Sequence, residues 1–244
     1  MKLNNNSLIN TIDDNLTCDY LIVGSGAGGS VAANELVNNN KDCILIEEGN
    51  YYSIDHFKGS MRKAMVSAWR NAGFTPIVGK PSFGYGEGMC LGGSTYVNGA
   101  LLWRTPEIIL NKWEKSGIIE GYNFQNLNKH YEKIEKKLNV VPENTDDGMN
   151  IDSKIIHELA KKKGIKSVYA PRAIKNCKRE NNCATGCSSG AKQSVLQGYL
   201  VEASYKSLRV ITNTKAIKIN YKSNKAVSLV AWHKTKKKKF QIKF

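Results

Sequence analysis

The sequence predicts an α/β fold with a parallel sheet, a helical insert and a small antiparallel sheet near its end, and three patterns carry that prediction. Residues 18–23 form a short apolar run that leads directly into a glycine-rich turn. An apolar stripe at helical spacing follows, and residues 43–46 then form a second apolar run without a polar interruption. From residue 208 onward, short alternating runs are separated by polar turns. We therefore expect a parallel βαβ unit early in the chain and a β-meander at its end.

Gly24, Gly26 and Gly29 follow the first apolar run at the spacing of a Rossmann-like dinucleotide-binding turn. Glycine at the first position allows the tight change from strand to helix. At the second it lets backbone amides approach a pyrophosphate, and at the third it lets the helix pack closely on the strand. The helix N-terminus favours the anion because its first amides have no partner within the helix. Ser25 and Ala27 complete the predicted cofactor-binding turn.

Glu47 closes the second apolar run. It follows the glycines at about the 20-residue separation at which an acidic side chain meets a ribose hydroxyl in this type of unit. We therefore predict that Glu47 contacts the cofactor. The alternative is an ordinary surface acid that follows a buried strand.

The composition sets broad limits on the function. With 244 residues, of which 41% are hydrophobic, the chain can bury a large core. It contains no run of 18 apolar residues, and its first residues lack the apolar centre of a signal peptide. We expect a polar tail over residues 1–16, no membrane span and a cytoplasmic location.

The formal charge of +15 is concentrated at one end of the chain. Residues 203–244 contain eleven lysines and one arginine, with no aspartate or glutamate. The lysine run at 234–239 is interpreted as a solvated hairpin turn, and a phosphate-binding patch is the alternative. Because the rest of the chain is nearly balanced in charge, we do not expect a nucleic-acid partner.

Helical patterns dominate residues 109–206. Two apolar stripes at helical spacing are interpreted as core packing, and they consist of Leu127, Tyr131, Ile134 and Leu138, and of Ile155, Ile156, Leu159 and Ala160. The four histidines lack a neighbouring base or a ligand spacing and are interpreted as ordinary surface or core residues.

A second glycine-rich loop indicates the family that this chain resembles. Gly92, Gly93 and Ser94 open this loop and Asn98 follows, within a stretch too rich in glycine for an ordinary helix. Together with the upstream glycine turn and with Glu47-Glu48-Gly49 at the second apolar run, this loop resembles the signature of the glucose-methanol-choline (GMC) family of flavin oxidoreductases. Further landmarks of the resemblance lie at residues 103–106, 110–113, 131–135, 190–194 and 199–200.

The resemblance implies FAD, with its isoalloxazine against Gly92, Gly93, Ser94 and Asn98, and with the adenine near the backbone of Ala216. Some members attach the flavin through a histidine directly before the asparagine, where this chain has Val97, so we predict noncovalent FAD. The chain departs from the usual signature at Gly88-Met89 and at Leu102, near the expected ring contacts.

The resemblance also divides the chain. Residues 17–108 correspond to the FAD-binding part with the flavin loop, 109–206 to a helical segment partly of the substrate domain, and 207–244 to a meander that returns to the FAD domain. The chain matches about the first half of the family's usual length, and the catalytic histidine is expected beyond residue 244. No residue of this chain is therefore predicted to be catalytic.

The implied reaction is the oxidation of the CH–OH group of a small-molecule alcohol, with hydride transfer to the flavin N5. We expect this chain alone to be inactive and turnover to need a C-terminal complement, while the electron acceptor stays open. The alternatives are a degenerate FAD-binding chain without catalysis and an NAD-dependent dehydrogenase, which leaves the second glycine loop unexplained.

Three cysteines lie close together in the sequence: Cys177, Cys183 and Cys187. Soft thiolates at short spacing suit an iron–sulfur cluster, and the spacing is similar to that of family members that hold one, although most such sites use four ligands. The alternative is that these are structural thiols in a reduced, intracellular chain.

Overall fold

The computed structural model describes residues 2–13, 16–54, 56–117, 120–142 and 151–244. It forms two compact units, the first made of Met1–Gly99 with Glu180–Phe244 and the second of Ala100–Arg179. The second unit begins and ends earlier than the expected helical segment 109–206. Residues 180–206 differ from the expectation because they pack with the glycine-rich turns of the first unit.

A three-stranded parallel sheet forms the centre of the first unit, as the sequence predicts. It consists of β2 (Tyr20–Val23), β3 (Cys43–Ile46) and β8 (Leu208–Ile211), in the order β2-β3-β8. Helix α1 (Ala27–Asn38) connects β2 to β3. The sequence places residues 210–212 in the meander, whereas β8 pairs in parallel with β3. The burial of both faces of β8, which only a central layer provides, explains the difference.

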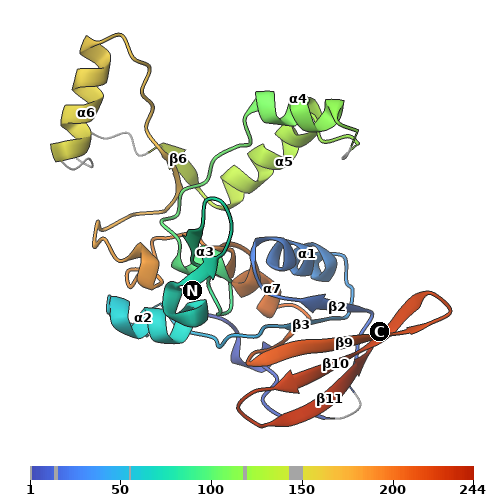
Figure 1. Cartoon of the computed structure of the whole chain (residues 1–244). Coiled ribbons are helices and arrows are strands. Elements are labelled where there is room, and N and C mark those ends of the chain that lie inside the picture. The colour runs from blue at the N-terminus through green and yellow to red at the C-terminus, as the bar shows by residue number, and fades with distance from the viewer. Residues whose placement is uncertain (1, 14–15, 55, 118–119, 143–150) are drawn as a thin grey trace. The chain divides into compact units, whose positions relative to one another are not determined.

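Strand β3 divides the core into two layers because alternate side chains point to opposite faces. Cys43 and Leu45 pack with Ala33 and Val37 of α1. On the other face, Ile44 and Ile46 join a cluster with residues of the C-terminal sheet, among them Leu229, Ala231, Phe240 and Ile242. All four residues of β3 are essentially inaccessible to solvent. Figure 1 shows α1 and the C-terminal sheet on opposite sides of β2 and β3.

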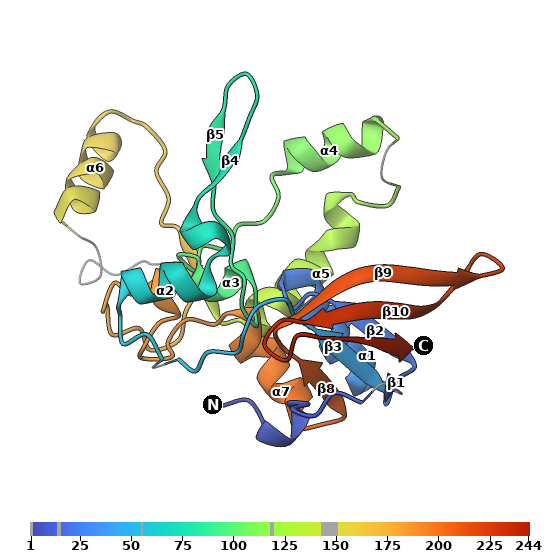
Figure 2. The same ribbon diagram turned by 60° about the horizontal axis from the view of Figure 1, so that its bottom comes forward.

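The predicted meander consists of β9 (Thr214–Lys222), β10 (Lys225–His233) and β11 (Lys238–Lys243), which pair antiparallel. Ser223 and Asn224 form the two-residue turn between β9 and β10 and both have positive φ, as a tight hairpin requires. This hairpin extends beyond the rest of the sheet in both views (Figures 1 and 2). The short strand β1 (Leu16–Thr17) adds to β11 in parallel.

The N-terminal segment is not the polar tail that the sequence predicts. Leu3, Ser7 and Ile12 are buried, and the 3₁₀ turn η1 (Asn5–Ser7) lies among them. The amide of Ile9 donates to the carbonyl of Val210 at 2.9 Å, so the segment covers the edge of β8. A few apolar residues between the asparagines are enough to dock it.

The remaining elements of the first unit are short. They are α2 (Met61–Ala68), the 3₁₀ turn η2 (Arg70–Gly73), the hairpin strands β4 (Thr75–Ile77) and β5 (Phe83–Tyr85), α3 (Ser94–Val97), the 3₁₀ turn η3 (Cys183–Thr185), the π-helical turn η4 (Leu196–Leu200) and α7 (Val201–Ser204). The last two lead into β8, which returns the chain to the parallel sheet.

The second unit contains α4 (Glu107–Lys115), α5 (Phe124–Lys137), α6 (Ile151–Lys162) and the paired strands β6 (Val140–Pro142) and β7 (Pro171–Ala173). Leu138 is buried, but Ile155, Ile156 and Leu159 of α6 are at least half exposed. The prediction of core packing is therefore wrong for the stripe on α6, because helical spacing shows that a face is apolar and not that anything covers it. Among the described residues, every helix is too short or too polar to cross a membrane.

Candidate functional site

The first glycine turn joins β2 to α1 and leaves the start of the helix open. Gly24 has a φ of +88° and its amide donates to the carbonyl of Ile46 at 2.8 Å, so the chain turns sharply at the end of the sheet. Gly26 is the N-cap of α1. A Cβ atom on Gly24, Gly26 or Gly28 would meet no described atom within 4 Å. The helix amides behind these glycines are therefore approachable by an anion.

Gly29 has the opposite environment. A Cβ atom at this position would lie 2.0 Å from the carbonyl oxygen of Gly24 and 3.3 Å from a methyl of Ile22. The first turn of α1 thus packs directly on β2 and its turn, which is the close approach that the sequence predicts for this glycine.

Glu47 stabilises the same turn from the end of β3. Its Oε2 accepts hydrogen bonds from the Ser25 amide at 2.9 Å and from the Ser25 hydroxyl at 2.6 Å. Its Oε1 accepts one from the amide of Gly49 at 2.8 Å. Glu47 is only 7% exposed, so the alternative of a surface acid is wrong. A carboxylate has about four acceptor positions, which leaves capacity for one further donor such as a hydroxyl.

The second glycine loop, residues 92–98, lies against the first turn. The amide of Gly92 donates to the Ser25 hydroxyl at 3.0 Å. A Cβ atom on Gly93, which has a φ of +54°, would lie 2.9 Å from Cα of Gly26. Two turns far apart in the sequence therefore form one continuous backbone surface, and Ser25 connects both to the carboxylate of Glu47.

The segment before this loop is fixed by the turn after β3. A bridge pairs Asn50 with Cys90, and the amide of Leu91 donates to the carbonyl of Asn50 at 2.9 Å. A Cβ atom on Gly49 would be only 2.0 Å from the carbonyl oxygen of Met89, so no other residue allows this crossing. Burial raises the pKa of the Cys90 thiol, and the charge of Glu47 adds to that effect.

Of the other residues predicted to contact the cofactor, Ser94 and Asn98 belong to the second glycine loop and Ala216 belongs to β9. Ser94 begins α3, and its hydroxyl accepts a hydrogen bond from the amide of Gly88 at 3.0 Å. Asn98 is the C-cap of α3, and both residues are exposed. Ala216 is partly buried on β9, two residues after Thr214, whose amide donates to the carbonyl of Glu47 at 2.8 Å. The structure thus brings the start of the meander to the end of β3.

Sequence reasoning missed an ion-pair network beside this site. Arg70 pairs with Glu48 at 3.0 Å and with Glu87, and Lys234 pairs with Glu48 at 2.9 Å. Burial by itself would raise the pKa of Glu48, but hydrogen bonds from Lys234 and Arg70 outweigh burial and lower it. Lys234, which opens the lysine run, is therefore an ion-pair partner and not a simply solvated turn residue. The only signal of this network in the sequence was the pair of adjacent acids after β3, Glu47 and Glu48.

A buried lysine, Lys192, was also missed as a site residue. It lies in the 190–194 motif, but a lysine in a sequence carries no signal of burial, and the structure places it 3% exposed beneath the second glycine loop.

The three clustered cysteines fall in two different units of the structure. Cys187 is buried, Cys183 is partly buried, and Cys177 is exposed in the second unit. Within the described residues, no group of three or more histidine, cysteine or acidic side chains is arranged to hold a metal ion. The predicted ligand set is therefore not supported, and the alternative of structural thiols fits Cys187.

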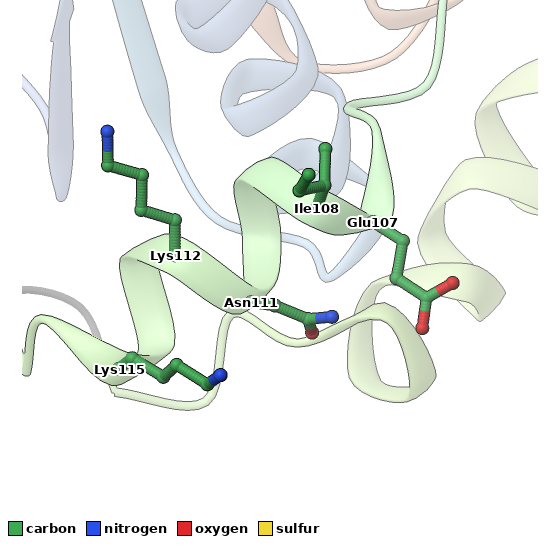
Figure 3. A pocket seen from close by; sticks show the side chains of 5 residues that line it. All are labelled: Glu107, Ile108, Asn111, Lys112 and Lys115. Carbon is green, nitrogen blue, oxygen red and sulfur yellow. The ribbon is translucent and has the colours of Figure 1, made fainter.

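A hollow of about 490 Å³ lies on α4, in the second unit. Figure 3 shows that its side chains all come from this one helix, and they are Glu107, Ile108, Asn111, Lys112 and Lys115. It includes none of the predicted site residues. We do not assign it a function.

A parallel βαβ unit whose first turn meets a second glycine loop defines a dinucleotide-binding class of protein. Within that class, the family model of the GMC oxidoreductases matches residues 18–243, and the chain belongs to this family.

The comparisons with individual proteins agree. An uncharacterized GMC-type oxidoreductase, y4nJ of Sinorhizobium fredii, is 30% identical over 88% of this chain and 42% of its own length. The long-chain-alcohol oxidase FAO4B of Arabidopsis thaliana is 27% identical over 82% of this chain and 26% of its own. The crystal structure of a formate oxidase has the same fold, with a TM-score of 0.73 and 15% identity over 95% of this chain and 44% of that one. The chain thus spans less than half the length of these relatives.

Proposed function

We propose that this chain binds FAD noncovalently and forms the cofactor-binding part of a GMC oxidoreductase that oxidises the CH–OH group of a small-molecule alcohol. The observation that carries the proposal is the contact between the two glycine turns, in which Gly93 lies against Gly26 and Gly92 donates to Ser25. A nicotinamide-binding unit needs only the first of these turns.

The residues present fit FAD. The open amides behind Gly24 and Gly26 suit the pyrophosphate, because a side chain at either position would fill that space. Glu47 has acceptor capacity for a ribose hydroxyl, and the start of β9 offers the backbone of Ala216 to the adenine. Gly92, Gly93, Ser94 and Asn98 would lie against the isoalloxazine. When bound, FAD supplies the acceptor for a hydride from the alcohol carbon.

The chain's own residues orient the cofactor and position its surroundings. The buried Ser25 hydroxyl donates to Glu47 and accepts from Gly92, so one side chain sets the spacing between the two turns. Val97 is buried and cannot form a bond to a flavin, which supports noncovalent binding. By the family resemblance, no residue of this chain corresponds to the base that accepts the alcohol proton. We therefore propose that turnover requires a C-terminal complement.

The test is reconstitution of the purified 244-residue chain with FAD, followed by absorbance and acid precipitation. We expect visible flavin bands that remain with the folded protein and that are released completely when acid denatures it. NAD would give no visible bands. Flavin that stays with the precipitate would contradict noncovalent binding, and a folded chain that retains no flavin would contradict the proposed function.

A matched pair of variants assigns the site. Gly26→Ala adds a methyl to the open cradle without touching a described atom, whereas Gly79→Ala adds one on the β4–β5 hairpin, at ordinary contact distance from Pro81. We expect Gly26→Ala to weaken FAD binding by about tenfold or more, equivalent to about 1.4 kcal/mol. Gly79→Ala should leave the affinity unchanged. Equal affinities of both variants would remove the first glycine turn from the binding site.

A further inference from the structure

We infer that Lys192 is a positioning residue that holds the second glycine loop in the conformation that receives the cofactor. This inference rests on the proposed function for its consequence, but its structural basis is independent of it. Lys192 follows η3 in the first unit and is 3% exposed, although lysine is among the residues least often buried.

The ammonium of Lys192 is enclosed by backbone carbonyls. Its Nζ donates to the carbonyl oxygens of Tyr96, of Asn98 at 3.0 Å and of Cys183 at 2.6 Å. A lysine ammonium has three N–H donors, and these three acceptors match them. Burial of an ammonium away from water is unfavourable, and these three hydrogen bonds offset that cost.

Two of these carbonyls belong to the end of the second glycine loop. Asn98 is the C-cap of α3 (Ser94–Val97), and Tyr96 lies in its last turn. The final carbonyls of a helix have no partner within the helix, and they favour a positive charge. Lys192 supplies both the hydrogen bonds and the charge. It therefore fixes where α3 ends and where Asn98 is presented.

The third carbonyl connects the loop to a separate segment. Cys183 begins η3 (Cys183–Thr185), and the residue that follows it, Gly186, is its C-cap with a φ of +92°. A Cβ atom on Gly186 would lie 2.4 Å from the ring of Tyr96, so this turn packs directly on that buried side chain. The Tyr96 hydroxyl donates to the carbonyl of Ser53 at 3.0 Å. Lys192 thus closes a contact in which η3 supports the underside of the loop.

The same loop carries the contacts to the first glycine turn. Gly92 and Gly93, at its start, touch Ser25 and Gly26, while Lys192 holds its end. Loss of the ammonium removes a donor from the buried carbonyl of Tyr96 and from the partly buried carbonyl of Asn98, which favours rearrangement of the loop. We expect that rearrangement to weaken cofactor binding. The effect of Lys192 is indirect, because its ammonium donates to backbone carbonyls of the loop.

The test compares Lys192→Met, which has similar length and no donor, with Lys192→Arg, which restores charge and donors. Lys225→Met is the control, because Lys225 is an exposed lysine at the tip of the β9–β10 hairpin. The first readout is hydrogen exchange of the cofactor-free chain at the amides of Tyr96 and Asn98, which donate to Gly93 and Ser94. The second is the dissociation constant of FAD, together with its visible spectrum.

We expect Lys192→Met to speed exchange at these two amides by about tenfold or more and to weaken FAD binding by a similar factor. Lys192→Arg should restore most of both, and Lys225→Met should change neither. If Lys192→Met does not fold, Lys192→Gln, which keeps two N–H donors, carries the same expectation with a smaller change.

Unchanged exchange at the loop in a folded Lys192→Met or Lys192→Gln chain would overturn the inference. Failure of the unsubstituted chain to bind FAD would instead contradict the proposed function, because the exchange experiment needs no cofactor. A uniform rise in exchange over the whole first unit would also overturn it, since that outcome shows general destabilisation and not positioning of the loop.

Discussion

Two neighbouring glycines at the start of α1 provide a sharp test of the site's geometry. Gly28 and Gly29 are both in the first turn of the same helix, and neither has a positive φ. A Cβ atom on Gly28 would meet no described atom within 4 Å, whereas one on Gly29 would lie 2.0 Å from the carbonyl oxygen of Gly24. The same substitution at adjacent positions should therefore have opposite effects on stability.

The expected magnitudes follow from the two environments. Gly28→Ala reduces the conformational freedom of the unfolded chain and improves helix propensity, which stabilises the chain by about 0.5–1 kcal/mol. Gly29→Ala gains the same amount but inserts a methyl more than about 1 Å inside normal contact distance. Because the opposing atom is backbone and part of a tight turn, relief requires α1 to move, at a cost of about 3 kcal/mol. We expect a net loss of about 2 kcal/mol.

The measurement is urea unfolding of the cofactor-free 244-residue chain, monitored by circular dichroism. The free energies of unfolding of the two variants should differ by about 3 kcal/mol, with Gly28→Ala above the unsubstituted chain and Gly29→Ala below it. Equal values would refute the close packing of α1 on β2. So would a larger loss in Gly28→Ala than in Gly29→Ala.

Three further predictions test the network, the meander and the second unit. Ser25→Ala removes a donor to Glu47 and the acceptor of the Gly92 amide. Urea unfolding should show that the free energy of unfolding falls by about 2–4 kcal/mol, and a fall below about 0.5 kcal/mol would contradict the role of Ser25 in connecting the two turns. Burial, with a smaller contribution from Lys236, lowers the pKa of His233 below its ordinary 6.5. Below that pH the unfolded chain therefore binds more protons than the folded chain, and the free energy of unfolding should fall as the pH falls. The thermal midpoint of His233→Gln should drop less between pH 7.5 and pH 5.5, and an equal drop would exclude this histidine. Hydrogen bonds from Arg104 lower the pKa of Glu135. In urea unfolding, Glu135→Gln should therefore lower the free energy of unfolding by about 1 kcal/mol at pH 7 and by less at pH 4, where the carboxylate begins to protonate. A larger loss at pH 4 than at pH 7 would contradict the ion pair.

The glycine turn, the strand after it and the hairpin near the end could be predicted from the sequence because each is set by neighbouring residues. Gly24 and Gly29 occupy positions that only glycine tolerates, and the uninterrupted β3 indicates burial on both faces. Ser223 and Asn224 indicate a tight turn. These are consequences of backbone sterics and of side-chain period, which a linear sequence displays directly.

Several other elements could not be predicted because their state depends on what lies opposite them. The apolar stripe on α6 has a helical period whether or not it is covered, and it is exposed. Strand β8 reads like a meander strand until its pairing with β3 is known. The N-terminal sequence predicts a polar tail because it contains few apolar residues, yet two of them, Leu3 and Ile12, are buried.

The sequence by itself determined that a dinucleotide-binding turn opens this chain and that a second glycine loop of the GMC type follows. Only the tertiary structure decided that the two touch through Ser25, that Glu47 spends three acceptor positions on its own chain, and that Lys192 is buried beneath the loop. The physical reason is that glycine placement reports local backbone geometry, whereas a hydrogen bond between residues nearly a hundred positions apart leaves no trace in their spacing.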